Sequence, residues 1–169
     1  MVGVNDGEPR WLNAEERETW LSWIAANALL DAALDRQMQR DAGMPMAYYQ
    51  ILVMLSEVPD RTLRMGILAE RTQSSHSRMS HAVARLEERG WVSRRTCAQD
   101  RRQTFATLTD EGFRVLAAAA PGHVATVRKY LFDRLTPEQA QQLTAISEEI
   151  RAGLTPEFRD PTEEARRLG

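Results

Sequence analysis

The chain has 169 residues, of which 43% are hydrophobic and 27% charged, and it can build a core that needs neither disulfides nor metals. The longest apolar run, residues 115–121, is too short to cross a bilayer, and the single cysteine, Cys97, cannot form an intramolecular disulfide, so we expect a cytoplasmic protein without a membrane partner. The net charge of −2 argues at first against a nucleic-acid partner.

The first predicted element is a long helix over residues 13–41, with Asn13 as its N-cap. Its larger apolar side chains recur at helical spacing on one side; they are Trp20, Trp23, Ile24, Leu30, Leu34 and Met38. Gly43 and Pro45 end this helix. A second helix is predicted directly afterwards, over residues 46–56.

A helix-turn-helix is predicted next. Its first helix covers residues 65–71, and a turn leads to a longer helix that starts after the N-cap Ser75 and runs to Arg89. Gly90 then occupies the position of a left-handed C-terminal cap. The helical spacing of apolar residues ends at this glycine.

Two strands are predicted after the helix-turn-helix, over residues 91–96 and 104–108, joined by a polar and basic loop. Such a hairpin is a wing. From Arg61 to Phe105 there are ten arginines and four acidic residues, a net charge of +6, and the remaining 12 basic and 20 acidic residues carry −8. A basic block within an acidic body is what local phosphate binding requires, although chance clustering on a solvated face remains the alternative.

The longer helix of the pair divides into two faces. Met79, Ala82, Val83 and Leu86 cluster on one side, and Ser77, Arg78, His81 and Arg85 lie on or beside the opposite side. A helix that enters the major groove of DNA needs a buried face for docking and hydrogen-bond donors near its N-terminus for base edges. The alternative is an amphipathic helix with a solvated polar face.

The loop of the wing carries Asp100, Arg101 and Arg102. An arginine at the tip of a wing can enter the minor groove, and we expect Asp100 to turn inward and hold the loop in place. Arg94 and Arg95, on the preceding strand, are either contacts to the DNA backbone or surface charges.

Two further helices are predicted after the wing. The first begins after the cap Thr109 and runs to about Arg134. The second starts at Thr136, with Pro137 at the first helical position and Gln139 completing a capping box, and its apolar stripe is Leu143, Ile146 and Ile150. Residues 155–169 read as a polar tail.

Four spaced motifs between residues 64 and 112 resemble the winged helix-turn-helix core of MarR-type transcriptional regulators. They are Leu68-Ala69, Leu86-Glu87-Glu88-Arg89-Gly90-Trp91-Val92, Asp100-Arg101-Arg102 and Leu108-Thr109-Asp110-Glu111-Gly112. The sequence departs from the family pattern in the turn at Gln73-Ser74, since the family commonly has glycine followed by an apolar residue there. The expected fold class is mainly α with a small β-hairpin wing.

The resemblance implies a homodimer that binds a palindromic operator in double-stranded DNA, usually as a repressor, and that is released by a small aromatic or phenolic ligand. It implies dimerisation helices in residues 1–45 and 109–154, around a DNA-binding lobe in residues 46–108. By position, Ser75, Ser77, Arg78 and His81 would face the major groove, with Arg85 on the same face. Arg102 would be the arginine at the wing tip, with Arg101 close to phosphate and Asp100 bracing the wing.

Aromatic residues gather in the first two helices. Trp20, Trp23, Asn27, Tyr48 and Tyr49 are therefore candidates for contacts to an effector, because the resemblance implies a ligand between the dimer helices and the DNA-binding lobe. Alternatively the aromatic side chains are dimer core, and Asn27 makes a structural hydrogen bond.

Other functions receive less support. Cys97 could make the protein a redox-responsive regulator, because nearby arginines would lower the pKa of its thiol. His76 and His81 diverge by about 140° around a helix, so no metal site is predicted, and no cofactor or enzyme motif is found. A winged-helix module that binds proteins instead of DNA is the competing class.

Overall fold

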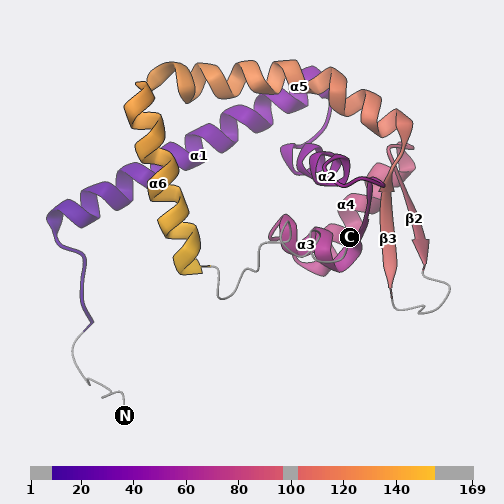
Figure 1. Cartoon of the computed structure of the whole chain (residues 1–169), viewed down its shortest axis with the longest axis horizontal. Coiled ribbons are helices and arrows are strands. Elements are labelled where there is room, and N and C mark those ends of the chain that lie inside the picture. The colour runs from indigo at the N-terminus through magenta and orange to yellow at the C-terminus, as the bar shows by residue number, and fades with distance from the viewer. Residues whose placement is uncertain (1–8, 97–102, 155–169) are drawn as a thin grey trace, which may run out of the picture. The chain divides into compact units, whose positions relative to one another are not determined.

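The computed structural model describes residues 9–96 and 103–154. By its internal contacts the chain forms two compact units, Met1–Ala33 and Leu34–Gly169, and each is considered separately. The elements in order are α1 (Ala14–Ala42), α2 (Met46–Ser56), β1 (Thr62–Arg64), α3 (Met65–Arg71), α4 (His76–Glu88), β2 (Val92–Thr96), β3 (Thr104–Leu108), α5 (Asp110–Tyr130), the 3-10 helix η1 (Phe132–Arg134) and α6 (Pro137–Leu154) (Figure 1). Within these ranges every helix is too short or too polar to serve as a membrane span.

Helix α1 begins where its capping residues predict. The Asn13 side-chain oxygen accepts a hydrogen bond from the backbone N–H of Glu16 at 2.9 Å, and the backbone N–H of Asn13 donates to the Glu16 carboxylate at 2.9 Å. This reciprocal pair satisfies two backbone donors that a helix end leaves open. The helix ends at Ala42, and Gly43 follows with a φ of 61°, a conformation that glycine adopts without strain.

The sheet has three antiparallel strands in the order β1-β3-β2, whereas the sequence predicted only the β2–β3 hairpin. Strand β1 was missed because its three residues are too few to show an alternating pattern. It is defined by pairing instead: Leu63 lies opposite Ala106, and the Thr62 and Thr107 hydroxyl oxygens are 2.9 Å apart. The wing is therefore the projecting part of a small sheet.

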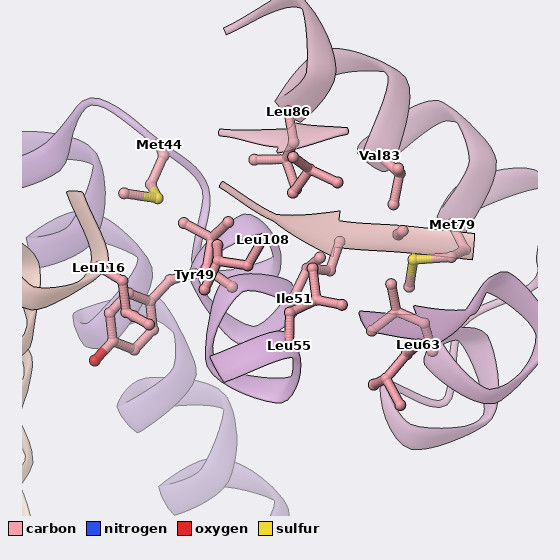
Figure 2. Close-up of a cluster of buried hydrophobic side chains, with 14 of the residues drawn as sticks. Met44, Tyr49, Ile51, Leu55, Leu63, Met79, Val83, Leu86, Leu108 and Leu116 are labelled. Atoms are coloured by element: carbon pink, nitrogen blue, oxygen red, sulfur yellow. The ribbon is translucent and has the colours of Figure 1, made fainter. Parts of the chain in front are cut away.

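The core lies between α2, α3, α4 and one face of the sheet, and α5 adds two buried apolar side chains, Leu116 and Ala119. Figure 2 shows side chains from α2, α4, the sheet and α5 in one cluster. Its fully buried large residues include Leu52, Leu55, Leu68, Val83 and Leu86. Each such side chain contributes about 1.5–3 kcal/mol when it leaves water, so this cluster fixes α4 against the rest of the lobe.

The C-terminal helices differ from the prediction at one boundary. Helix α5 ends at Tyr130 and not near Arg134, because the backbone of Leu131 leaves the helical region and η1 follows. No glycine or proline marks this end; instead the Arg134 side chain donates to the Lys129 carbonyl at 3.2 Å. The capping box of α6 is confirmed, since the Thr136 and Gln139 side chains each accept a backbone N–H of the other.

Candidate nucleic-acid interface

The turn of the helix-turn-helix is tight and well bonded. The Ser74 N–H donates to the Ala69 carbonyl at 2.9 Å, and the Thr72 hydroxyl donates to the Leu68 carbonyl at 2.8 Å. Between them Gln73 has a φ of 50°, in the left-handed region. This is the position at which the sequence departs from the family's usual glycine, so a non-glycine residue carries the strain of the turn.

Replacing Gln73 with glycine is expected to stabilise the protein by about 0.5–1 kcal/mol, because the relief of left-handed strain exceeds the added entropy of the unfolded chain. The urea midpoint should rise while the slope of the unfolding curve stays unchanged. Gln73→Ala is the matched control, since alanine keeps the strain and should give no gain. A loss of stability in Gln73→Gly would show that the glutamine side chain itself supports the turn.

Helix α4 has the two faces that its sequence predicts. Met79, Val83 and Leu86 are at most 2% exposed, whereas Ser77, Arg78 and His81 are exposed. The N-cap prediction for Ser75 is confirmed, because its hydroxyl oxygen accepts the Arg78 N–H at 3.3 Å. The exposed face thus presents hydroxyl, guanidinium and imidazole donors near the helix N-terminus, where the helix dipole favours an anion.

Ion pairs neutralise part of the basic block. Among the described residues, Arg61 pairs with Asp110 at 3.1 Å, Arg85 with Glu88 at 2.8 Å, and Arg94 with Glu87 at 2.6 Å. Arg78 has no ion pair among the described residues. Of the two arginines that we place on the exposed face of α4, Arg78 is thus the one free to donate to DNA.

Glu87 links α4 to the wing, a role that the sequence did not suggest. Its carboxylate accepts from both the Arg94 Nε, at 2.7 Å, and the Arg94 backbone N–H, at 3.0 Å. Hydrogen bonds from Arg94 hold the pKa of Glu87 below its usual range. Of the two roles left open for Arg94, a DNA-backbone contact or a surface charge, the geometry supports a paired charge that braces the base of the wing. The sequence signal that could have indicated this pair is a glutamate seven residues before an arginine, with the turn at Gly90 between them.

Glu87→Gln is expected to lower stability slightly at neutral pH, by about 0.5 kcal/mol, because the pair is partly exposed to water. Since the folded-state pKa of Glu87 is below the ordinary value near 4.5, the pair stabilises the protein above that pH. Its contribution is lost as the pH falls through the folded-state pKa. The difference between the two proteins in urea unfolding should therefore disappear in acid. A difference that persists unchanged at low pH would contradict this account.

The tip of the wing falls outside the described residues. Cys97, Asp100, Arg101 and Arg102 belong to residues 97–102, so their expected roles stay predictions. The strands on either side are described up to the opposed pair Thr96 and Thr104.

The effector candidates of α1 lie in the first compact unit. Trp20 is 52% exposed and Trp23 is 40% exposed, which is high for tryptophan. The Asn27 side chain donates to the Trp23 carbonyl of its own helix at 2.8 Å. This bond matches the structural role that was the alternative for Asn27.

The two tyrosines of α2 have different settings. Tyr49 is 6% exposed and its ring centroid lies 4.8 Å from that of His123, and burial raises the pKa of Tyr49 and lowers that of His123. These contacts favour a packing role for Tyr49. Tyr48 instead lines a pocket of about 470 Å³ together with Gln39, Arg85 and Arg89. Of the pair, Tyr48 is therefore the better placed to meet a ligand.

Comparison with known proteins identifies close relatives. The model of the MarR family matches residues 42–103. The chain is similar to Sco3205 of Streptomyces coelicolor, a MarR family transcriptional regulator whose crystal structure is in complex with DNA, with 56% identity, 90% of this chain and 94% of the other covered, and a TM-score of 0.84. It is also similar to AbsC of the same organism, with 38% identity, 88% and 99% coverage, and a TM-score of 0.81. The transcriptional regulator HosA of Escherichia coli is 32% identical over 55% of this chain and 67% of its own length.

Proposed function

Since the chain belongs to the MarR family of transcriptional regulators, we propose that it binds a specific DNA sequence as a homodimer on a palindromic operator and represses transcription. One observation carries this proposal: the N-terminal half of α4 presents exposed donors while its opposite face is fixed in the core. That is the geometry of a helix that docks in the major groove. The likeness to Sco3205, whose structure is in complex with DNA, supports the same function.

Specificity would reside in α4. Arg78 and His81 are proposed to reach base edges, and Ser75 and Ser77 to contact phosphates or bases near the helix N-terminus. Arg85 has the same proposed role, but Glu88 competes for its guanidinium and should weaken the contact. Arg101 and Arg102 are proposed to contact phosphate and the minor groove, with Asp100 bracing the loop.

Exposed apolar side chains support the homodimer. In α1, Trp20, Trp23 and Ile24 are 39–52% exposed, and in α6 Ile146 and Ile150 are 55% and 47% exposed. Large apolar side chains in such numbers mark surfaces that bind another protein. A two-fold dimer brings identical surfaces together, so each helix can supply both partners of its own contact.

Release by a small aromatic or phenolic effector is part of the proposal. The pocket beside Tyr48 supports it, because Arg85 and Arg89 near the end of α4 line the same space. A ligand there would contact the DNA-reading helix directly, and it would dissociate DNA only if it binds the DNA-free form more tightly.

Binding to the DNA upstream of the protein's own coding sequence, titrated over a range of salt concentrations, tests the proposal. Affinity should fall steeply with salt, and Arg78→Ala should weaken binding at least about tenfold. Arg114→Ala is the control for the loss of one positive charge, since it removes an exposed arginine of α5 that pairs with Glu111 and lies outside α4. No binding at low salt, or equal loss in both variants, would contradict the assignment of α4.

A further inference from the structure

A row of three side chains crosses the sheet on the wing. Phe105 of β3 lies opposite Arg64 of β1 and opposite Arg95 of β2 in the strand register. The guanidinium carbon of Arg64 lies 5.9 Å from the centre of the Phe105 ring, and that of Arg95 lies 5.2 Å from it. Two cations therefore flank one aromatic ring within cation–π distance.

This row faces away from the core. Side chains alternate between the faces of a strand, and the neighbouring row contains the buried Leu63 and Ala106 together with Arg94, which turns toward Glu87 of α4. Arg64 and Arg95 are both exposed. Among the described residues neither forms an ion pair, in contrast to Arg94.

The aromatic ring positions the two arginines without consuming their donors. The ring attracts each guanidinium through its π-electrons and offers no lone pair, so the N–H groups of both arginines are left for other acceptors. Strands lie about 4.8 Å apart, so the two arginines stand roughly 10 Å from each other across β3, and no carboxylate of the described residues forms an ion pair with either. An anionic partner with repeated charges would relieve this repulsion and use the open donors.

The place of the row in the wing indicates which anion this is. Arg95 and Phe105 are one position from Thr96 and Thr104, the last described pair of the hairpin, and Figure 1 shows β2 and β3 running together toward that end. A hairpin entering the minor groove, which is about 6 Å wide, has a phosphate backbone on each side. The face of the sheet that carries Arg94 is turned toward α4. The opposite face, which carries Arg64, Phe105 and Arg95, would therefore contact the one of the two phosphate backbones that lies farther from α4.

We propose that Arg64, Phe105 and Arg95 form a second phosphate-binding site, which holds the DNA backbone on the outer side of each half-site. The site rests on the proposed function, because it requires the wing to lie on DNA. It adds affinity without reading bases, since both arginines would contact phosphates. Phe105 is a positioning residue that acts through the two guanidinium groups.

Two duplexes and two variants test this site. An operator obtained by selection from random DNA is used in a short form that ends at the inverted repeat, and in a long form with about ten more base pairs on each side. Arg64→Ala/Arg95→Ala removes up to four phosphate contacts per dimer, so the slope of log affinity against log salt on the long duplex should fall by about 3–4. Affinity at about 0.1 M salt should fall on the order of 10- to 100-fold. Phe105→Leu should reproduce part of this loss.

The short duplex and the unfolding curve provide the controls. On the short duplex the wild-type protein should show a smaller slope of log affinity against log salt than on the long duplex. The double variant should have nearly the same slope as the wild-type protein there. Urea unfolding of Phe105→Leu checks that its loss of DNA affinity exceeds its loss of folded protein. If selection with the wild-type protein enriches no operator, the proposed function and this site both fail. If an operator is enriched, and the double variant keeps the wild-type slope on the long duplex, only the second site is wrong.

Discussion

Replacing Gly112 with alanine is expected to destabilise the protein by about 3 kcal/mol or more, because the new methyl group has no space. A Cβ at this position would lie 2.1 Å from the Trp91 carbonyl oxygen and 2.8 Å from the Leu108 side chain. The carbonyl cannot move away freely, since it accepts hydrogen bonds from the Thr109 backbone N–H at 3.0 Å and the Thr109 hydroxyl at 3.1 Å. The first turn of α5 is thereby fixed against the start of the wing.

Urea unfolding measures this loss, and Gly153→Ala is the matched control. Gly153 lies in α6, and no atom of the described residues approaches within 4 Å of its Cβ position. Alanine there should raise stability by up to about 1 kcal/mol, because it favours the helix. Equal effects of the two substitutions would mean that the close approach at Gly112 has no energetic consequence.

Introducing Ile146→Glu and Ile150→Glu together is expected to convert the dimer into a monomer. The two side chains are one helical turn apart on α6 and are 55% and 47% exposed, so the substitutions leave the core of the lobe intact. A two-fold dimer would have to bury four carboxylates, which costs several kcal/mol, and the dimer dissociation constant should rise on the order of 1,000-fold or more. DNA affinity should fall with it, because each monomer holds only one half-site.

Sedimentation velocity at micromolar concentration measures this effect. Gln141→Glu/Thr144→Glu adds the same charge to the opposite face of α6 and should leave the dimer intact. A wild-type protein that sediments as a monomer would contradict the homodimer. If both double variants dissociate equally, charge alone would be responsible, and α6 would not form the interface.

The parts of the interface that local sequence signals determine were predictable. Ser75, the buried positions of α4 and Gly90 follow from capping rules and helical periodicity, and the structure has them as expected. Strand β1 and the early end of α5 were not predictable, because the first depends on pairing with a distant strand and the second on side chains that take the place of a glycine cap.

Charge counting located the basic block but could not say which arginines are free. Which arginines are free depends on the carboxylates that the fold brings near them. Arg85 forms an ion pair with Glu88 and Arg94 with Glu87, whereas Arg78 forms none among the described residues. The row of Arg64, Phe105 and Arg95 also depends on a register that only the three-stranded sheet creates. The effector candidates were chosen for aromatic content, which does not separate the buried Tyr49 from Tyr48 beside a pocket.

Selection of bound duplexes from random DNA, carried out with the wild-type protein and with Arg78→Ala, tests the central claim most directly. The wild-type protein should enrich an inverted repeat whose half-sites are about ten base pairs apart, as two copies of α4 in successive major grooves require. Arg78→Ala should lose the preference for one base at symmetric positions in both half-sites. Enrichment of no sequence, or of the same repeat with unchanged preferences by both proteins, would contradict the assignment of α4 as the helix that reads DNA.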